Sequence, residues 1–267
     1  MDITRFVADL REAAFLLGDH AAYRAQLSRR LRVVRRKLGR ATSATAAYAP
    51  VPVTAGDIAA NGEALHLLLL VAERAWAHAM AIKAAHAEAR PAQHITGATR
   101  QHLLSRLHKA ATTAAHMAAL IADRPASGAS DVDVLEATAY ARALAGAEHF
   151  ERQADGIKPG SVLPRRWATA LGHLAAARVI YSALFTATRE DVFKDVLAAT
   201  IDPSIRYAAY QSRIPRTVGV PQVARQFFPV DDAPLLLAVQ QLDPTALQAE
   251  EAATSCKSSH TRPRTRR

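Results

Sequence analysis

The amino-acid sequence predicts an all-α protein, and its composition and the spacing of its apolar residues both support this. Of the 267 residues 50% are apolar, yet only 6% are aromatic. Alanine is abundant throughout, whereas runs of the β-branched residues that favour strands are nearly absent. In most segments apolar side chains recur three or four residues apart, which is the period of an amphipathic helix. A chain of this length can bury a sizeable core as one large domain or two small ones.

The first part of the chain divides into helices with clear start and stop signals. Residues 3–17 carry apolar side chains at helical spacing, and a glycine followed by Asp19 predicts a helix end and then an N-cap. A basic helix is therefore expected over residues 20–39. The Ala-, Thr- and Pro-rich segment 40–56 is expected to be a long loop, either a plain linker or a second contact beside the basic helix. A long, central and buried helix is predicted over residues 57–86, capped by its first residue.

The remaining helices are expected to form antiparallel pairs. Helical spacing predicts a short helix after Pro203 and longer helices over residues 99–122, 131–153, 165–188 and 189–200. Small Ala and Gly residues at the expected crossings predict a tetratricopeptide-like helical solenoid or bundle, with its pairs over residues 57–212. One approximate tetratricopeptide unit is visible: ALAGAEHF followed by WATALGHLAAARVIY, interrupted by residues 153–164.

These patterns predict one helical domain over residues 1–242, followed by a tail. The last part of the domain, residues 213–242, is an irregular helical extension interrupted by prolines. Beyond Asp243 the apolar periodicity is lost, so residues 243–267 are predicted to be disordered. The tail is basic, and its cations are Lys257, Arg262, Arg264, Arg266 and Arg267.

Residues 23–40, YRAQLSRRLRVVRRKLGR, carry most of the functional prediction. No acidic residue lies between Asp19 and Asp57. The cations of this stretch are Arg24, Arg29, Arg30, Arg32, Arg35, Arg36, Lys37 and Arg40. A helical projection places them on three sides of one apolar stripe, formed by Tyr23, Leu27, Leu31, Val34 and Leu38. Like-charge pairs three or four residues apart each cost about 0.2 to 0.5 kcal/mol, so a bound polyanion is expected to stabilise the helix.

The net charge of the chain is unevenly distributed. Of the formal charge of +10, residues 20–56 supply eight cations and the residues after Ala253 supply five more, and neither of these two stretches holds an acid. A second, weaker basic patch is expected on the helix over residues 99–122, where Arg100, Arg106 and Lys109 have no acidic residue nearby. A near-neutral helical body with basic segments is typical of a phosphate-binding protein.

No motif in the sequence indicates an enzyme, a cofactor or a metal site. We find no nucleophile beside a base, no paired carboxylates, no phosphate-binding glycine loop, and no metal-ligand spacing among the 11 histidines. A single cysteine, Cys256, excludes a disulfide framework, and an intracellular monomer is expected. The longest strongly apolar run, residues 67–72, is far shorter than the about 20 residues of a membrane span, so no membrane insertion is expected.

Four separated segments carry a family resemblance: YRAQLSRRLRVVRRKLG, AERAWAHAMAIK, RQHLLSRLHKA and IDPSIRYAAYQ. In this order they resemble the N-terminal RNA-binding domain of the 68-kDa subunit of the eukaryotic signal recognition particle. The resemblance extends from Arg5 to Gln211 and implies a tetratricopeptide-like fold. It also implies that an arginine-rich helix binds the particle's RNA at a multi-helix junction and remodels a loop there. The residues matching this helix are Arg29, Arg30, Arg32, Arg35, Arg36 and Lys37, and the second contact region of the family would include Arg100, Arg106 and Lys109.

The chemistry of arginine agrees with this resemblance. A guanidinium group pairs with phosphate oxygens and guanine edges and stacks on unpaired bases. The major groove of regular A-form RNA is too deep and narrow for a helix, so a bulge, loop or junction must open it. Structured, irregular RNA is therefore favoured over duplex DNA. The resemblance further implies a role in co-translational targeting to the endoplasmic reticulum, with cytoplasmic localisation and nuclear or nucleolar assembly.

The resemblance also brings in a protein partner. In the family, the 68-kDa subunit is far longer than this chain and uses its C-terminal part to bind the 72-kDa subunit. This chain ends before such a region, so it is expected to be either a fragment or a reduced form, and contact with the 72-kDa subunit stays an open alternative.

A second hypothesis comes from a different class of function. A helical protein-interaction scaffold could use the same basic helix to bind an acidic peptide or an anionic membrane surface. A membrane-surface helix usually has large residues such as Trp or Phe on its apolar face, whereas this stripe has Leu, Val and one Tyr. Salt dependence and competition by structured RNA would distinguish the two hypotheses.

Overall fold

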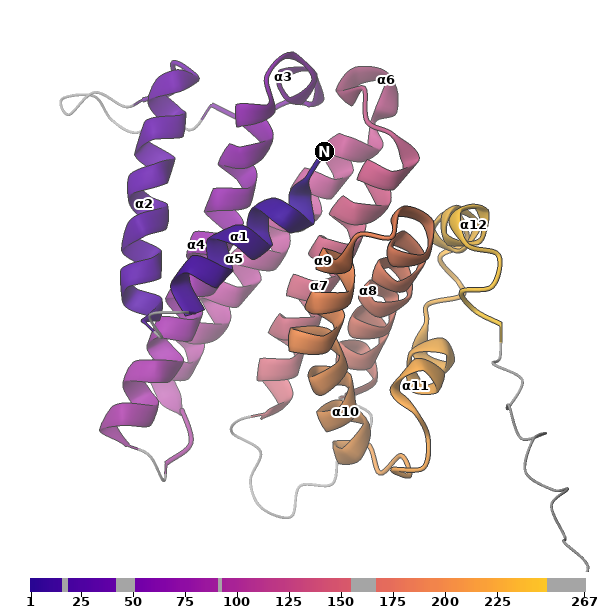
Figure 1. The fold of residues 1–267 in the computed structure, drawn as a ribbon. Coiled ribbons are helices and arrows are strands. Elements are labelled where there is room, and N and C mark those ends of the chain that lie inside the picture. The colour runs from indigo at the N-terminus through magenta and orange to yellow at the C-terminus, as the bar shows by residue number, and fades with distance from the viewer. Residues whose placement is uncertain (16–18, 42–50, 91–92, 155–166, 249–267) are drawn as a thin grey trace, which may run out of the picture.

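The structure is a computed structural model that describes residues 1–15, 19–41, 51–90, 93–154 and 167–248 (Figure 1). Within these residues every regular element is a helix, so the all-α prediction is confirmed. The elements are α1 (Ile3–Phe15), α2 (His20–Lys37), α3 (Ala55–Ala60), α4 (Gly62–Ala89), α5 (Gly97–Ala122), α6 (Arg124–Ser127), α7 (Asp131–Ala154), α8 (Trp167–Thr188), α9 (Asp191–Val196), the π-helical turn η2 (Leu197–Ile201), α10 (Asp202–Gln211), α11 (Val220–Phe227) and α12 (Ala233–Leu242).

The long helices α2, α4, α5, α7 and α8 lie side by side and alternate in direction (Figure 1). Each packs on its neighbours in the chain, as expected for antiparallel pairs. Helix α1 crosses this array diagonally and contacts α2, α4 and α7, while α10 and α11 pack on α8 at the opposite end (Figure 1). The basic helix α2 therefore forms one edge of the molecule, and the C-terminal helices form the other.

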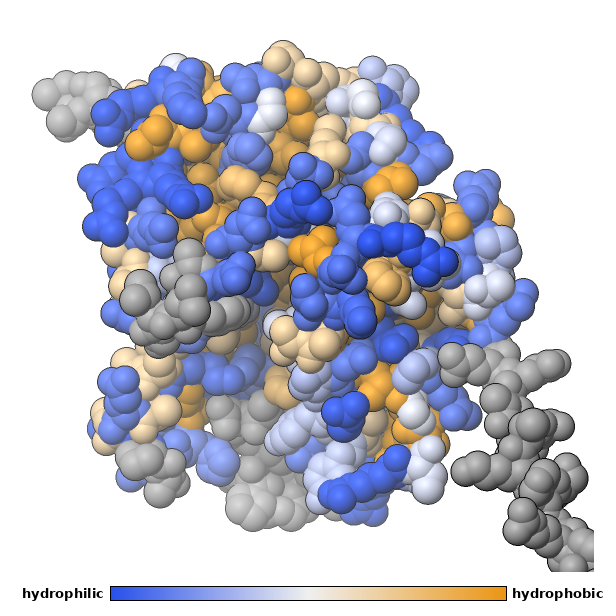
Figure 2. Space-filling view, viewed as in Figure 1, coloured by the Kyte–Doolittle hydropathy of each residue, from blue (hydrophilic) through white to orange (hydrophobic). Residues whose placement is uncertain are grey.

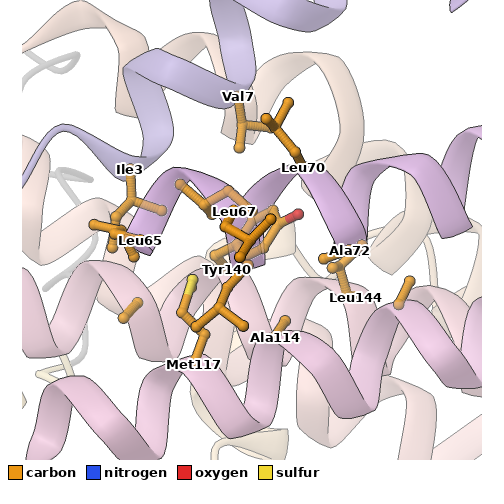
Figure 3. Packing of buried hydrophobic residues seen from close by; sticks show 14 of the residues in the cluster. Ile3, Val7, Leu65, Leu67, Leu70, Ala72, Ala114, Met117, Tyr140 and Leu144 are labelled. Carbon is orange, nitrogen blue, oxygen red and sulfur yellow. The ribbon is translucent and has the colours of Figure 1, made fainter. Parts of the chain in front are cut away.

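Two main apolar clusters make up the core. The first joins α1, α2, α4, α5 and α7, and the second joins α7 to α8 and the C-terminal helices. Figure 3 shows how Leu67 of α4, Met117 of α5 and Tyr140 of α7 converge in the first cluster, beneath Ile3 and Val7 of α1. Because α7 contributes to both clusters, it connects the basic edge to the C-terminal end.

Helices α4 and α8 are apolar almost all round because they lie inside the array. By length and composition alone, both are long and apolar enough to cross a membrane. This criterion admits more helices than the uninterrupted apolar run that was used in the sequence analysis. In the fold, however, 50% of the most apolar 18-residue stretch of α4 is buried, and 61% of the corresponding stretch of α8 is buried. Packing against neighbouring helices thus accounts for their hydropathy.

Helices α7 and α8 form the pair that the tetratricopeptide-like pattern predicted. Gly146 allows their close approach, since a Cβ atom at this position would lie 2.7 Å from Cδ2 of Leu174. The expectation that small residues occupy a helix crossing is met here. Residues 155–166, which connect the two helices, lie outside the described residues.

Apart from shifts of a few residues at helix ends, two predicted helices are divided or joined differently in the structure. The helix expected over residues 57–86 is two helices, because Asn61 adopts an extended conformation between α3 and α4. Thr54 caps α3 in a capping box with Asp57, and the Asn61 side chain accepts the N–H of Glu63 at 2.9 Å. The predicted cap at Asp57 was therefore wrong, because Asp57 occupies the third position of a helix that Thr54 caps.

The second difference concerns the helix expected to end at Thr200. Instead, α9 continues through the π turn η2 into α10, so residues 191–211 form one interrupted helix. Pro203 cannot donate to the carbonyl four residues before it, and its ring would clash with that group in a regular α-helix. A π turn just before the proline widens the helix and accommodates this defect.

The fold also extends beyond the predicted end of the domain at residue 242. Part of the predicted tail belongs to the fold: Asp243 is 8% exposed and Leu247 packs against the second core cluster. The disorder predicted for the rest concerns residues 249–267, which lie outside the described residues, as do residues 42–50 of the long loop. Within the described part of that loop, Val53 is buried.

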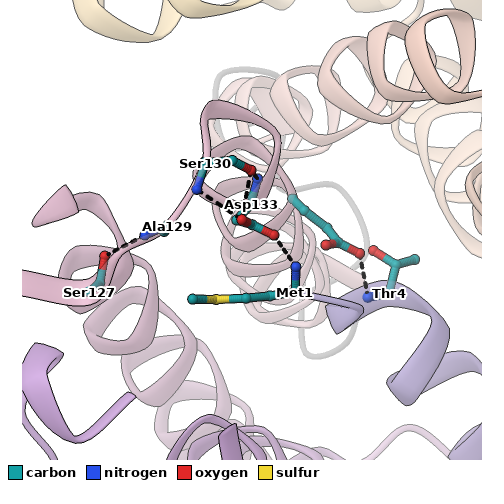
Figure 4. A network of polar contacts seen from close by, with 7 residues as sticks. Met1, Thr4, Ser127, Ala129, Ser130 and Asp133 are labelled. Carbon is teal, nitrogen blue, oxygen red and sulfur yellow. Dashed lines mark hydrogen bonds and ion pairs between the residues drawn. The ribbon is translucent and has the colours of Figure 1, made fainter. Parts of the chain in front are cut away.

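The start of α1 is attached to α7 by polar contacts (Figure 4). The amino group of Met1 contacts the carboxylate of Asp133, and the N–H of Thr4 donates to Glu136 at 2.7 Å. Glu136 is 5% exposed, and burial raises the pKa of its carboxyl group. These contacts fix the register of α1 across the helical array.

Candidate nucleic-acid interface

Helix α2 presents its cations outward because its apolar stripe is buried. Asp19 caps the helix by accepting the N–H groups of Ala21 and Ala22 at 2.8 and 3.0 Å. The buried stripe consists of Tyr23, Leu27, Leu31 and Val34, with Leu38 packed at its edge. Both the predicted cap and the predicted stripe are confirmed.

The cations of α2 form a dense exposed surface. The exposed arginines are Arg24, Arg29, Arg30, Arg32 and Arg36. Arg35 is half-buried and lines a hollow of about 370 Å³ with residues of α4 and α5. Val33 is 48% exposed among these cations, so the surface also offers one apolar side chain. Figure 2 shows the hydrophilic side chains gathered over α2 at the left edge of the molecule.

Two cations at the end of α2 are engaged within the protein. Lys37 Nζ lies 2.6 Å from Glu63 Oε1, and Arg40 Nη2 lies 2.8 Å from Asp57 Oδ2. Arg40 also donates to the backbone carbonyls of Val51 and Pro52 at 3.4 and 3.3 Å. Hydrogen bonds from Thr54 and then from Arg40 lower the pKa of Asp57. Lys37 and Arg40 therefore attach the end of α2 to the α3–α4 region, in addition to any contact with a ligand.

The two basic patches predicted from the sequence meet in the structure. A cavity of about 160 Å³, which we call the basic cleft, lies between α2, α4 and α5. Its polar lining is Arg24 and Ser28 of α2, Arg74 and His78 of α4, and Arg106 and Lys109 of α5. No carboxylate is among the described residues that line this cleft. Its size and its one-sign lining fit a phosphate group.

The lowered pKa of His78 reflects its burial and the positive charges around the basic cleft. Burial lowers the pKa of the imidazole, and the charges of Arg24, His102, Arg106 and Arg74 lower it further. Arg74 and His78 were not predicted as site residues, because they lie in the helix over residues 57–86, which was predicted to be central and buried. Their spacing of four residues, which places them on one helix face, is the signal that could have found them.

The third residue predicted on α5 lies apart from this cleft. Arg100 is half-buried in the first turn of α5, and its Nη2 donates to the backbone carbonyl of Arg152 at 2.9 Å. It does not line the basic cleft. The structure thus brings Arg106 and Lys109 to the surface of α2 but leaves Arg100 beside the end of α7.

A buried ion pair adds a polar attachment to the apolar packing of α2. Glu73 of α4 is fully buried, and its carboxylate accepts two hydrogen bonds from Arg11 of α1 at 2.9 and 2.8 Å. It also accepts the hydroxyl groups of Tyr23 and Tyr140 at 3.1 and 2.7 Å. Burial, followed by the charge of Glu73, raises the pKa of both phenols, so they remain donors. Through Tyr23 this network connects α2 to three other helices.

The described residues contain no group of three or more His, Cys, Asp or Glu side chains that could hold a metal ion. The site itself presents arginine, lysine and histidine side chains on a convex helix and in an adjoining cleft. Such a surface can neutralise several phosphates at once and can form bidentate contacts with them.

The fold and this surface define a class of protein: an all-helical domain with one densely cationic edge. The family model described as "SRP68: RNA-binding signal recognition particle 68" matches residues 15–265. The chain belongs to this family. No curated protein matches it.

A solved structure also resembles the chain. The structure of the SRP68 RNA-binding domain from Chaetomium thermophilum superposes with a TM-score of 0.69 at 45% sequence identity. The match covers 84% of this chain and 96% of that one. The family resemblance inferred from the four sequence segments is therefore confirmed.

Proposed function

We propose that this protein is a structural, RNA-binding subunit of the signal recognition particle and that α2 and the basic cleft form its RNA-binding surface. The observation that carries this proposal is the placement of α2. Its apolar stripe and Tyr23 attach it to the core, while its arginines face outward beside Arg74, Arg106 and Lys109. Family membership supports signal recognition particle RNA as the ligand.

The shape of this surface favours RNA with an opened groove. Helix α2 is convex, and the basic cleft beside it is concave. If α2 enters a groove of the RNA, a phosphate at the edge of that groove would lie in the cleft. A regular A-form groove does not admit a helix, whereas a multi-helix junction does. We therefore infer that the protein binds the junction of the particle's RNA and helps remodel it for co-translational targeting to the endoplasmic reticulum.

The test compares three ligands of equal length: signal recognition particle RNA with its junction, a perfect RNA duplex and a DNA duplex. We expect the junction RNA to bind most tightly at physiological salt, because only it offers an open groove as well as phosphates. Fluorescence anisotropy measures the three affinities. Equal affinity for all three would contradict the proposal, and displacement of the junction RNA by an acidic peptide would favour a protein-interaction scaffold instead.

A further inference from the structure

A second acid-free segment lies at the end of the molecule opposite to α2. Residues 203–230 contain Arg206, Arg213, Arg216 and Arg225 but no aspartate or glutamate. They form most of α10, the following turn and α11. This segment therefore carries a net positive charge, as residues 20–56 do, and such a charge favours anionic ligands.

A groove of about 630 Å³ lies between α10 and α11 in this segment. Its floor is apolar and includes Ile205 and Val223, which are both buried. Its rim consists of the side chains of Arg206, Tyr207, Tyr210 and Arg216, all of them exposed. The accessible part of the groove thus combines aromatic rings with guanidinium groups.

The two tyrosines are presented on one face of α10. Tyr207 is 44% exposed and Tyr210 is 57% exposed, and they lie one helical turn apart. The ring of Tyr207 packs against the rings of Phe150 and Trp167. The distances between ring centroids are 5.3 Å to Phe150 and 5.8 Å to Trp167. Its ring orientation is therefore fixed by packing, while its outer face stays accessible.

The turn after α10 brings Arg216 back over Tyr210, with its guanidinium carbon 5.2 Å from the ring centroid. Arg213 adopts a left-handed backbone conformation with φ of 59°, which is uncommon for a residue with a side chain. The N–H groups of Arg213 and Ile214 donate to the carbonyls of Tyr210 and Ala209, both at 3.0 Å. These bonds fix the turn and hold the rim of the groove in place.

We propose that the α10–α11 groove binds unpaired nucleotides of RNA, with bases stacked on Tyr210 and Tyr207 and phosphates held by Arg206 and Arg216. Exposed aromatic rings flanked by arginines are the means by which proteins hold single-stranded nucleic acid. The absence of carboxylates along residues 203–230 suits a polyanion. The proposal rests on the proposed function only in taking RNA as the nucleic acid.

The experiment uses a short, unstructured, fluorescently labelled RNA oligonucleotide and the full chain. Binding is measured for the wild type and for Tyr210→Ala, Tyr210→Phe and Val230→Ala, where Val230 is 60% exposed and does not line the groove. We expect Tyr210→Ala to weaken binding by about 5- to 150-fold, the range for loss of one stacked base, while Tyr210→Phe and Val230→Ala stay within about twofold.

All measurements are repeated with Arg32→Glu/Arg36→Glu, which disables α2. If the groove is a separate site, this variant still binds the oligonucleotide and the effect of Tyr210→Ala persists, whether or not α2 binds junction RNA. Photocrosslinking of a 4-thiouridine oligonucleotide should label the peptide that contains Tyr210.

Equal affinity of the wild type and Tyr210→Ala for the oligonucleotide would overturn the inference, as would loss of all oligonucleotide binding in the α2 variant. In either case the groove would be better explained as a docking site for an apolar peptide.

Discussion

The two ends of this molecule share the sign of their charge but differ in the side chains that they expose. Helix α2 at one edge exposes five arginines and one large apolar residue, Val33, while its tyrosine is buried against Glu73. The α10–α11 end exposes fewer cations but two tyrosines, beside an apolar groove. This difference indicates that positive charge alone does not define the ligand contact. The α2 edge is suited to phosphates in a groove, and the opposite end is suited to unstacked bases.

The two ends also differ in how they are attached to the core. Helix α2 is held by a buried carboxylate that accepts hydrogen bonds from Arg11, Tyr23 and Tyr140. Tyr207 of α10 is held by contacts with the rings of Phe150 and Trp167. Both ends are packed on the core by apolar side chains, but the tyrosine of α2 contacts a buried carboxylate, whereas Tyr207 of α10 contacts aromatic rings.

The largest expected effect tests the phosphate-binding end. Arg32→Glu/Arg36→Glu removes two exposed cations and adds two repelling charges, so affinity for junction RNA should fall on the order of a hundredfold or more. Circular dichroism should show an intact fold, because both side chains are exposed and helix propensity barely changes. Wild-type affinity in this variant would mean that α2 is not the RNA-binding element.

Salt dependence and a conservative variant sharpen this test. If about six phosphates are neutralised, wild-type affinity should fall about a thousandfold between 50 and 200 mM salt. Arg32→Lys/Arg36→Lys should weaken binding with a similar salt slope, because charge is kept while bidentate and stacking contacts are lost. The oligonucleotide at the α10–α11 groove should show a shallower slope, because stacking releases no counterions.

The next effect concerns the attachment of α2. Glu73→Ala should lower the free energy of unfolding by about 3 to 5 kcal/mol, because Arg11 and two phenols lose a buried partner. Urea denaturation measures this loss, and Glu73→Gln should cost less because the amide oxygen can still accept the tyrosine hydroxyls. Tyr210→Ala serves as the control, because Tyr210 is 57% exposed and does not attach α10 to the core, and it should stay within about 0.5 kcal/mol of the wild type. Equal losses for Glu73→Ala and Tyr210→Ala would mean that the buried carboxylate does not stabilise the attachment of α2.

A smaller effect tests the helix crossing between the two ends. Gly146→Ala should destabilise the protein by about 1 to 3 kcal/mol, because its Cβ would lie 2.7 Å from Leu174. Gly172→Ala, on the facing helix, places a Cβ 3.7 Å from the nearest atom and should stabilise by about 0.5 to 1 kcal/mol. Thermal denaturation distinguishes the expected loss of stability in Gly146→Ala from the expected gain in Gly172→Ala. Increased stability of Gly146→Ala would show that the packing of α7 on α8 can relax.

The smallest effect is a pH dependence that only the α2 edge should show. The pKa of His78 is lowered by burial and by Arg24, His102, Arg106 and Arg74, so the imidazole is neutral at pH 7 in the free protein. A phosphate in the basic cleft favours the protonated ring and raises its pKa in the complex. Affinity for junction RNA should therefore rise severalfold as the pH falls through the pKa that His78 has in the complex. It should level off below the pKa that His78 has in the free protein. The affinity ratio of wild type to His78→Gln isolates this effect from the other histidines, and a ratio that is constant between pH 5.5 and 7.5 would contradict it.

Much of the α2 edge could be predicted from the sequence because its determinants are local. The stripe from Tyr23 to Leu38, the cap at Asp19 and the outward arginines all follow from helix periodicity within one segment. The all-α class follows equally from composition and spacing. The family was identifiable because four segments of this chain resemble segments of the family's RNA-binding domain in the same order. The basic helix is the first of them.

Only the tertiary structure decided which distant residues meet. Arg24, Arg74 and Arg106 lie on three different helices, and their convergence on one cleft depends on how α2, α4 and α5 are rotated against one another. The pairing of Lys37 with Glu63, and the placement of Tyr207 on Phe150 and Trp167, likewise join segments far apart in the chain. Helix periodicity fixes which face of each helix is apolar, but the contacts between helices depend on packing of whole apolar surfaces, which no local pattern encodes.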